Sequence, residues 1–142
     1  MRFRTPTIAD PHFSEGGSRP KLLIEDPDAW AYAEHFEGAG FEVALCAGPQ
    51  PGVPDCSRCP LVWNGQCSAV ETADVVLSAL PGDVGMPIVE AMAERARRVP
   101  TVLHVPAPRA DDYRQLLGDA TIVALPASLA ELEAAVRKAV AA

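Results

Sequence analysis

The sequence predicts a single α/β domain built on a doubly wound, five-stranded parallel sheet. Five short apolar runs, each about as long as a strand, are separated by stretches with helical periodicity. The runs are almost continuously apolar, which is typical of strands buried on both faces. A chain of 142 residues is long enough to enclose one core. Right-handed crossovers would then place helices on both faces of the sheet.

The elements can be assigned in order from residue 21 onward. The apolar runs expected to form strands are KLLI at 21–24, FEVALC at 41–46, DVVLSAL at 74–80, PTVLHV at 100–105 and TIVAL at 121–125. The stretches expected to form helices are 27–40, 68–73, 86–99, 111–117 and 126–142. Because strands and helices alternate along the chain, each pair of strands can be joined by a helical crossover.

Capping signals and apolar faces support the helix assignments. Asp26 is a favourable N-cap residue and Pro27 suits a first helical position. Ser128 and Glu131 have the spacing of a capping box before the last helix. The side chains expected to face the core are Trp30, Ala33 and Phe36 in the first helix, Ile88, Met92 and Ala96 in the third, and Leu129, Leu132, Val136 and Val140 in the last.

Composition and charge indicate which part of the chain folds and which classes of partner it binds. Residues 1–19 lack periodicity and are expected to form a mobile arm, leaving 20–142 as the folded domain. The net charge is −7, and the one basic cluster, Arg95, Arg97 and Arg98, is interpreted as a solvated helix end. We therefore expect no nucleic-acid or membrane partner. No secretion signal is recognised, so a cytoplasmic location is expected, with a protein partner or a second copy of the chain as candidates.

From Lys21 to the end, the sequence resembles a response-regulator receiver domain, a flavodoxin-like three-layer fold. The segments that carry this resemblance are LLIEDPDAW, ADVVLSALPG and TIVALPASLAELEAAVRKAV. They resemble the family's first strand with its acidic pair, its third strand with the following loop, and its last strand, turn and helix. The resemblance implies the fold and a role in signal transduction through a protein partner.

The catalytic residues of a receiver are not present at the matching positions. Glu25 and Asp26 stand at the acidic pair, where a receiver holds Mg²⁺. The phosphoacceptor position falls on Ala79, beside Ser78, and the lysine position falls on Leu125. The hydroxyl position falls near Val105. The resemblance therefore implies a pseudo-receiver without aspartyl phosphorylation, in which Glu25 and Asp26 are interpreted as acids at a helix start rather than metal ligands.

All four cysteines lie in one stretch, at positions 46, 56, 59 and 67. Disulfides are not expected, because the compartment is taken to be reducing. Buried structural cysteines are a second interpretation, and Cys46 at a strand end suits it. The interpretation we favour is a metal or cluster site with Cys46, Cys56, Cys59 and Cys67 as ligands, because thiolates bind both zinc and iron–sulfur clusters. Structural zinc usually shows two paired knuckles, whereas this loop has a single CxxC followed by proline.

The stretch CSRCPLVWNGQC is also similar to the iron–sulfur loop of adenine DNA glycosylases and to the CxxCP core of WhiB-like regulators. This local resemblance implies a [4Fe–4S] cluster, with zinc as the alternative, and it implies no base-excision activity. Trp63 is expected either to cover such a centre or to fill the gap between loop and sheet. His104, in the fourth strand, is interpreted as a core histidine that could reach the same edge.

Two functions remain open at this stage. One is a non-enzymatic regulatory or interaction domain that carries the cysteine-bound centre and acts as a redox or oxygen sensor. The other is an electron-transfer or thiol-redox component that uses the same cysteines. Strand two ends at Cys46, so both functions place the site at the carboxyl edge of the sheet, where open α/β sheets bind their ligands.

Overall fold

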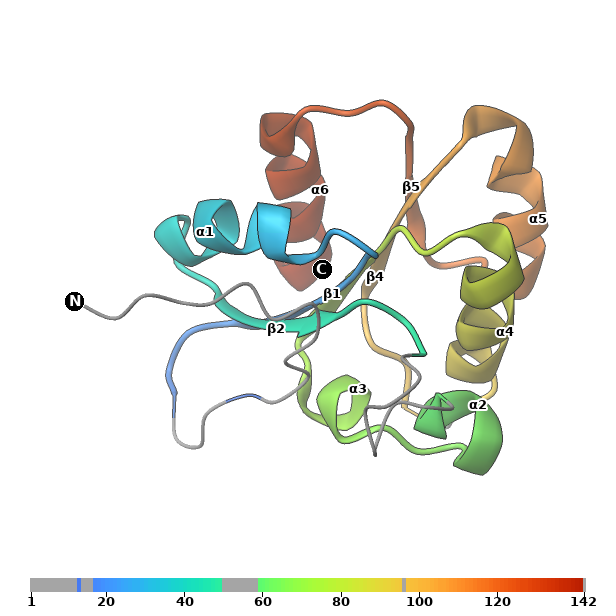
Figure 1. Ribbon diagram of the computed structural model, residues 1–142. Helices are drawn as coiled ribbons and strands as arrows, with labels where there is room; N and C mark the ends of the chain where they lie inside the picture. The colour runs from blue at the N-terminus through green and yellow to red at the C-terminus, as the bar shows by residue number, and fades with distance from the viewer. Residues whose placement is uncertain (1–12, 14–16, 50–58, 96, 142) are drawn as a thin grey trace.

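The computed structural model describes residues 13, 17–49, 59–95 and 97–141. Within them, five parallel strands form one sheet in the order β2-β1-β3-β4-β5 (Figure 1). The strands are β1 (Lys21–Glu25), β2 (Glu42–Cys46), β3 (Val75–Ser78), β4 (Thr101–Val105) and β5 (Thr121–Ala124). The predicted doubly wound parallel sheet is confirmed, and every predicted strand lies within two residues of its expected bounds.

Helices cover both faces of the sheet and define two main cores. One face is covered by α1 (Trp30–Gly38) and α6 (Leu129–Ala141), and the other by α2 (Pro60–Asn64), α3 (Ser68–Thr72), α4 (Gly82–Ala93) and α5 (Ala110–Leu116) (Figure 1). Successive residues of β1 serve opposite cores: Leu22 and Ile24 pack toward α1 and α6, whereas Leu23 packs toward α2, α3 and α4. This alternation decides which polar side chains can meet at the end of the sheet.

The first helix begins later than predicted. Asp26 is not its N-cap, because the Asp26 carboxylate accepts a hydrogen bond from the backbone N–H of Asp28 at 2.7 Å and closes a turn before the helix. The helix then starts at Trp30. Its inner face is Ala33 and Phe36, and Trp30 is 48% exposed, so the prediction that Trp30 faces the core was wrong.

Two further helices differ from prediction. Residues 60–64 form α2, a single turn that begins at Pro60 and ends at Gly65, which has a left-handed backbone (φ 73°). The helix α4 starts at Gly82, four residues before the predicted start, and contains Pro87. The predicted buried residues Ile88 and Met92 are confirmed, whereas Ala96 lies outside the described residues.

The last helix agrees with its predicted start. The backbone N–H of Glu131 donates to Ser128 Oγ at 3.1 Å, and the Glu131 carboxylate accepts from the backbone N–H of Ser128 at 3.3 Å. These are the two bonds of a capping box. Leu132 and Val136 are buried against the sheet, as predicted. Phe13, in the segment expected to be an arm, packs against the core beneath α2, α3 and α4.

No helix in the described ranges is long and apolar enough to span a membrane.

Candidate cysteine and carboxylate site

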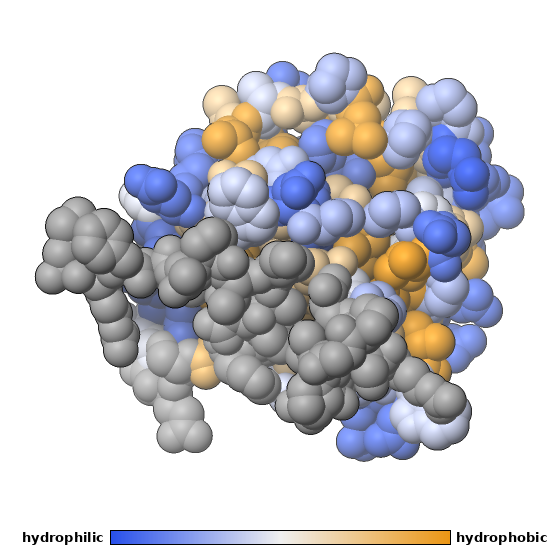
Figure 2. All heavy atoms as spheres, in the orientation of Figure 1, coloured by the Kyte–Doolittle hydropathy of each residue, from blue (hydrophilic) through white to orange (hydrophobic). Residues whose placement is uncertain are grey.

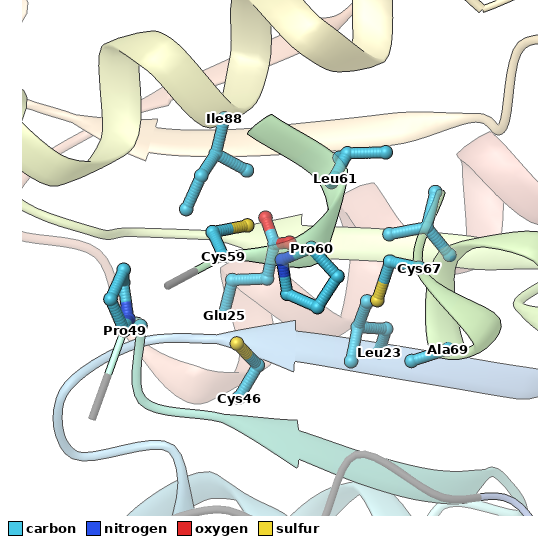
Figure 3. Close-up of a pocket in the computed structure, with 12 residues that line it drawn as sticks. Leu23, Glu25, Cys46, Pro49, Cys59, Pro60, Leu61, Cys67, Ala69 and Ile88 are labelled. Atoms are coloured by element: carbon cyan, nitrogen blue, oxygen red, sulfur yellow. The ribbon is translucent and has the colours of Figure 1, made fainter. Parts of the chain in front are cut away.

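Three of the four predicted cysteines line one cavity at the carboxyl edge of the sheet (Figure 3). Cys46 is the last residue of β2, Cys59 precedes α2, and Cys67 precedes α3. The fold therefore brings together thiols from three segments, because β2, α2 and α3 all border the same face of the sheet. Cys56, the fourth predicted ligand, lies outside the described residues.

The cavity is small and largely apolar. Its volume is about 30 Å³, and Leu23, Leu61 and Ile88 contribute apolar walls. Leu61 is 1% exposed and provides apolar cover for the cavity. Each of the three cysteines is partly buried. The apolar walls therefore limit the access of water to these thiols without closing it off.

Glu25 is the fourth group with a polar side chain in this cavity, and sequence reasoning misassigned it. It was interpreted as a helix-start acid, but it is the last residue of β1 and is 3% exposed. It shares a face of the strand with Leu23 and pairs in register with Cys46 on one side and Ser78 on the other. The helix begins five residues later and on the opposite face, so its N-terminus cannot stabilise this carboxylate.

Burial strongly perturbs Glu25. Desolvation raises the pKa of its carboxyl group from 4.5 to about 7, and a hydrogen bond with the Ser78 side chain opposes part of this shift. Its Oε1 atom has no hydrogen-bond partner in the described part of the chain. A buried carboxylate oxygen without a partner is costly, so this atom is the main unsatisfied feature of the cavity.

Glu25 and the thiols influence one another. Burial raises the pKa of the Cys59 thiol; backbone N–H groups of α2 oppose this, and the nearby charges of Glu25 and Cys67 add to it. Figure 3 shows Cys46 and Cys59 on either side of the Glu25 side chain, with Cys67 farther along the sheet toward Leu23. Cys59 and Cys67 carry free thiols.

The thiols are grouped but not yet arranged around a common point. Among residues 13, 17–49, 59–95 and 97–141, no three Cys, His, Asp or Glu side chains lie close enough together to hold a metal ion. The donor set itself, thiols with one carboxylate, suits a borderline cation such as Zn²⁺ or iron. Binding would therefore require side-chain rotations that bring the donors into contact with the ion.

His104 does not reach this cavity. It lies in β4 two residues after Val102, which packs in the core beneath α1 and α6, so strand alternation directs His104 to that side. There it is buried, and desolvation lowers its pKa while the charge of Asp26 opposes the shift. The two buried acids at the end of β1 thus lie on different faces of the sheet: Glu25 lies beside the thiols, and Asp26 lies beside His104.

Trp63 does not fill the gap between loop and sheet. It is 70% exposed and lies on the outer side of α2, where it borders a surface groove together with Val62 and Asp83. Figure 2 shows hydrophobic residues on this side of the molecule next to hydrophilic ones. The apolar cover of the cavity comes from Leu61 instead.

Solved structures identify the fold that carries this site. A scan of protein-family models and a search of curated proteins found no match. The non-phosphorylated HemR receiver domain from Leptospira biflexa aligns with a TM-score of 0.63 and 17% identity, over 87% of this chain and 96% of that one. The beryllofluoride-activated NtrC receiver domain gives 0.61 and 19%, over 88% and 97%. Chemotaxis protein CheY4 of Vibrio cholerae gives 0.60 and 16%, over 86% and 99%.

The chain has the receiver fold. At 16–19% identity to these three structures, the likeness establishes the fold alone, and the chemistry has to be derived from this chain's own residues. The receiver-like sheet places Ala79 directly after β3, where its backbone N–H donates to the Glu25 carbonyl oxygen at 2.7 Å. Val105 ends β4, and Leu125 follows β5 and is 43% exposed. These positions carry no carboxylate, hydroxyl or amine.

Proposed function

We propose that this chain is a regulatory or protein-interaction domain of receiver fold that works without aspartyl phosphorylation and carries a cysteine-ligated iron–sulfur or zinc centre. One observation supports it above all: Cys46, Cys59 and Cys67, from three separate segments, line one cavity. Glu25, which lines the cavity, accepts a backbone hydrogen bond from Ala79, the position where the resemblance puts the phosphoacceptor. A bound centre would occupy the edge of the sheet from which a receiver signals.

The centre would act on the domain by joining α2 and α3 to the sheet. A ligand set drawn from the end of β2 and the starts of α2 and α3 couples the positions of these segments to metal occupancy. Loss or oxidation of the centre would release α2, and α2 packs beside α4 (Figure 1). A protein partner that contacts α2 and α4 would then bind differently to the metal-loaded and metal-free domains, because their surfaces differ. This is the behaviour of a two-state protein whose equilibrium a ligand shifts.

The alternative function, a thiol-redox or electron-transfer component, is less well supported by the acidity of the thiols. A reactive cysteine needs a lowered pKa, because the thiolate is the nucleophile. Burial raises the pKa of the Cys59 thiol instead. The proposal takes a reducing compartment such as the cytoplasm as the setting, in which thiols stay available for metal.

Metal analysis tests the proposed centre. Protein purified without oxygen should contain zinc, or iron with sulfide, in about one-site amounts. Cys59→Ser and Cys67→Ser should each remove most of this metal, because the loss of one thiolate removes a ligand. Ile88→Val is the matched control, since Ile88 lines the same cavity without offering a donor. Metal-free wild-type protein, or full occupancy in both serine variants, would contradict the proposal.

A second test concerns phosphorylation. Incubation with acetyl phosphate and Mg²⁺ should leave the intact mass unchanged, because Ala79 cannot form an acyl phosphate and Leu125 cannot neutralise one. A receiver domain that is known to accept phosphate from acetyl phosphate serves as the positive control. An acid-labile adduct of one phosphoryl group on this protein would show that another carboxylate, with Glu25 and Asp26 as the first candidates, accepts the phosphoryl group.

A further inference from the structure

Glu25 is a buried acid that the fold itself does not explain. The residues that precede it in β1, Leu22, Leu23 and Ile24, are at most 1% exposed and apolar, so the sheet would pack equally well with an apolar residue at this position. Glu25 keeps a carboxyl group there with Oε1 unpartnered by any described residue. A buried polar atom without a partner calls for an explanation, and a bound ion is one that would complete its bonding.

The surroundings of Glu25 call for a cation. The described residues that line the cavity include no lysine, arginine or histidine, so the chain offers no countercharge there. What they do include is three thiols, which become anionic when they bind metal. A carboxylate and three thiolates around one cavity would repel one another without a positive ion, and a divalent cation would neutralise half of this charge and bond to each of the four groups.

The size of the cavity favours a single ion. A volume of about 30 Å³ accommodates one small atom or ion. An iron–sulfur core of four irons and four sulfides is several times larger and would need a larger rearrangement of the cavity than the side-chain rotations that a single ion requires. The combination of sulfur donors with one oxygen donor also excludes Mg²⁺, which takes oxygen ligands in an octahedral arrangement.

We propose that Glu25 completes a four-donor zinc site in this cavity. Its other ligands would be the thiolates of Cys46, Cys59 and Cys67, which line the same cavity and would have to rotate toward one point to hold the ion. This inference rests on the proposed function and narrows it, because the centre becomes a mixed thiolate–carboxylate zinc site that needs no ligand from Cys56. Zinc binds both sulfur and carboxylate oxygen tetrahedrally, and its binding releases the thiol protons to solvent. The Glu25 carboxylate then has a partner for Oε1, and Ser78 remains hydrogen-bonded to the same carboxyl group.

Cobalt is the probe for the ligand set. Co²⁺ is added to the reduced, metal-free full-length protein, and its visible bands report tetrahedral geometry while near-ultraviolet charge-transfer bands report bound thiolates. Zn²⁺ should displace it. We expect Glu25→Gln to weaken Co²⁺ binding about tenfold or more and to shift the visible bands, with the thiolate bands retained. Cys56→Ser should leave affinity and spectrum within about twofold of wild type, a change of under 0.5 kcal/mol.

Asp26→Asn is the matched control. Asp26 is the adjacent buried carboxylate, but it bonds to Asp28 and faces His104 rather than the thiols. It should bind Co²⁺ like wild type. Circular dichroism of metal-free Glu25→Gln checks folding. We expect the fold to be intact, because glutamine has nearly the shape of glutamate and carries no charge that burial would disfavour.

The outcomes separate this inference from the broader proposal. If Glu25→Gln binds Co²⁺ with wild-type affinity and spectrum, or if Cys56→Ser abolishes binding, Glu25 is not the fourth ligand and the inference fails, while the cysteine centre stands. Iron and sulfide in protein purified without oxygen would also contradict the zinc inference and leave the cysteine centre standing. If wild-type protein binds no Co²⁺, Zn²⁺ or iron, both the inference and the proposed centre fail.

Discussion

Replacing Phe36 by alanine is expected to destabilise the fold by about 3–5 kcal/mol, a large part of the stability of a domain of this size. Phe36 is fully buried on the inner face of α1. Its ring makes edge-to-face contacts with His35 and Phe41, at centroid distances of 5.3 Å and 6.0 Å. Alanine would leave a cavity between α1 and the sheet that the neighbouring side chains cannot fill.

Urea unfolding followed by circular dichroism measures this loss. The matched control is Trp30→Ala, an aromatic truncation on the same helix at a residue that is 48% exposed. It should cost less than about 1 kcal/mol, because surface substitutions have small effects. Equal unfolding midpoints for the two variants would mean that α1 does not pack on the sheet as described.

Glu25 is expected to make the stability of the metal-free protein depend strongly on pH. Burial raises the pKa of Glu25 from 4.5 to about 7, so between these values the folded protein holds a proton that the unfolded chain has released. Stability therefore falls as pH rises through this window. The full difference is about 3 kcal/mol, reached above pH 8, where the carboxylate is ionised in both states.

The measurement compares unfolding free energies of metal-free wild type and Glu25→Gln at pH 5 and pH 8. The variant should gain about 2.5 kcal/mol over wild type between the two pH values, since glutamine stays neutral and part of the full difference is already present at pH 5. Asp26 and His104 also titrate abnormally, but they are present in both proteins, so their contributions cancel in the comparison. Parallel pH profiles would show that Glu25 is not held in an apolar cavity.

Placing a cation beside this carboxyl group should reverse the pH trend, because a bound ion favours the ionised form. The metal-free protein thus carries a desolvation cost at Glu25 that a bound cation would relieve. This links the two proposals physically: the same residue that destabilises the empty domain near neutral pH would stabilise the loaded one. A receiver fold in which a metal replaces the phosphoryl group as the occupant of the sheet edge would have a comparable two-state character.

The sequence alone determined the strands of the sheet and the start of the last helix. The apolar runs at 21–24, 41–46 and 100–105 predicted buried strands, because each is short, mostly apolar and followed by a stretch with helical or loop character. Ser128 and Glu131 specified the start of the last helix through bonds between residues three apart. Cys46 was correctly placed at a strand end for the same reason: these signals are local, and a local pattern is fully present in the sequence.

The tertiary structure decided what meets at the edge of that sheet. The helix at 60–64 is too short to show periodicity, so Leu61 as cover and Trp63 as a surface residue could not be distinguished beforehand. Glu25 and His104 both lie in strands, and strand alternation directs them to opposite sides only once the helices on each face are known. Side chains of a strand point alternately to the two faces of the sheet, and the sequence does not say which helices cover which face. Which acid faces the thiols is therefore decided by how the helices pack on the sheet.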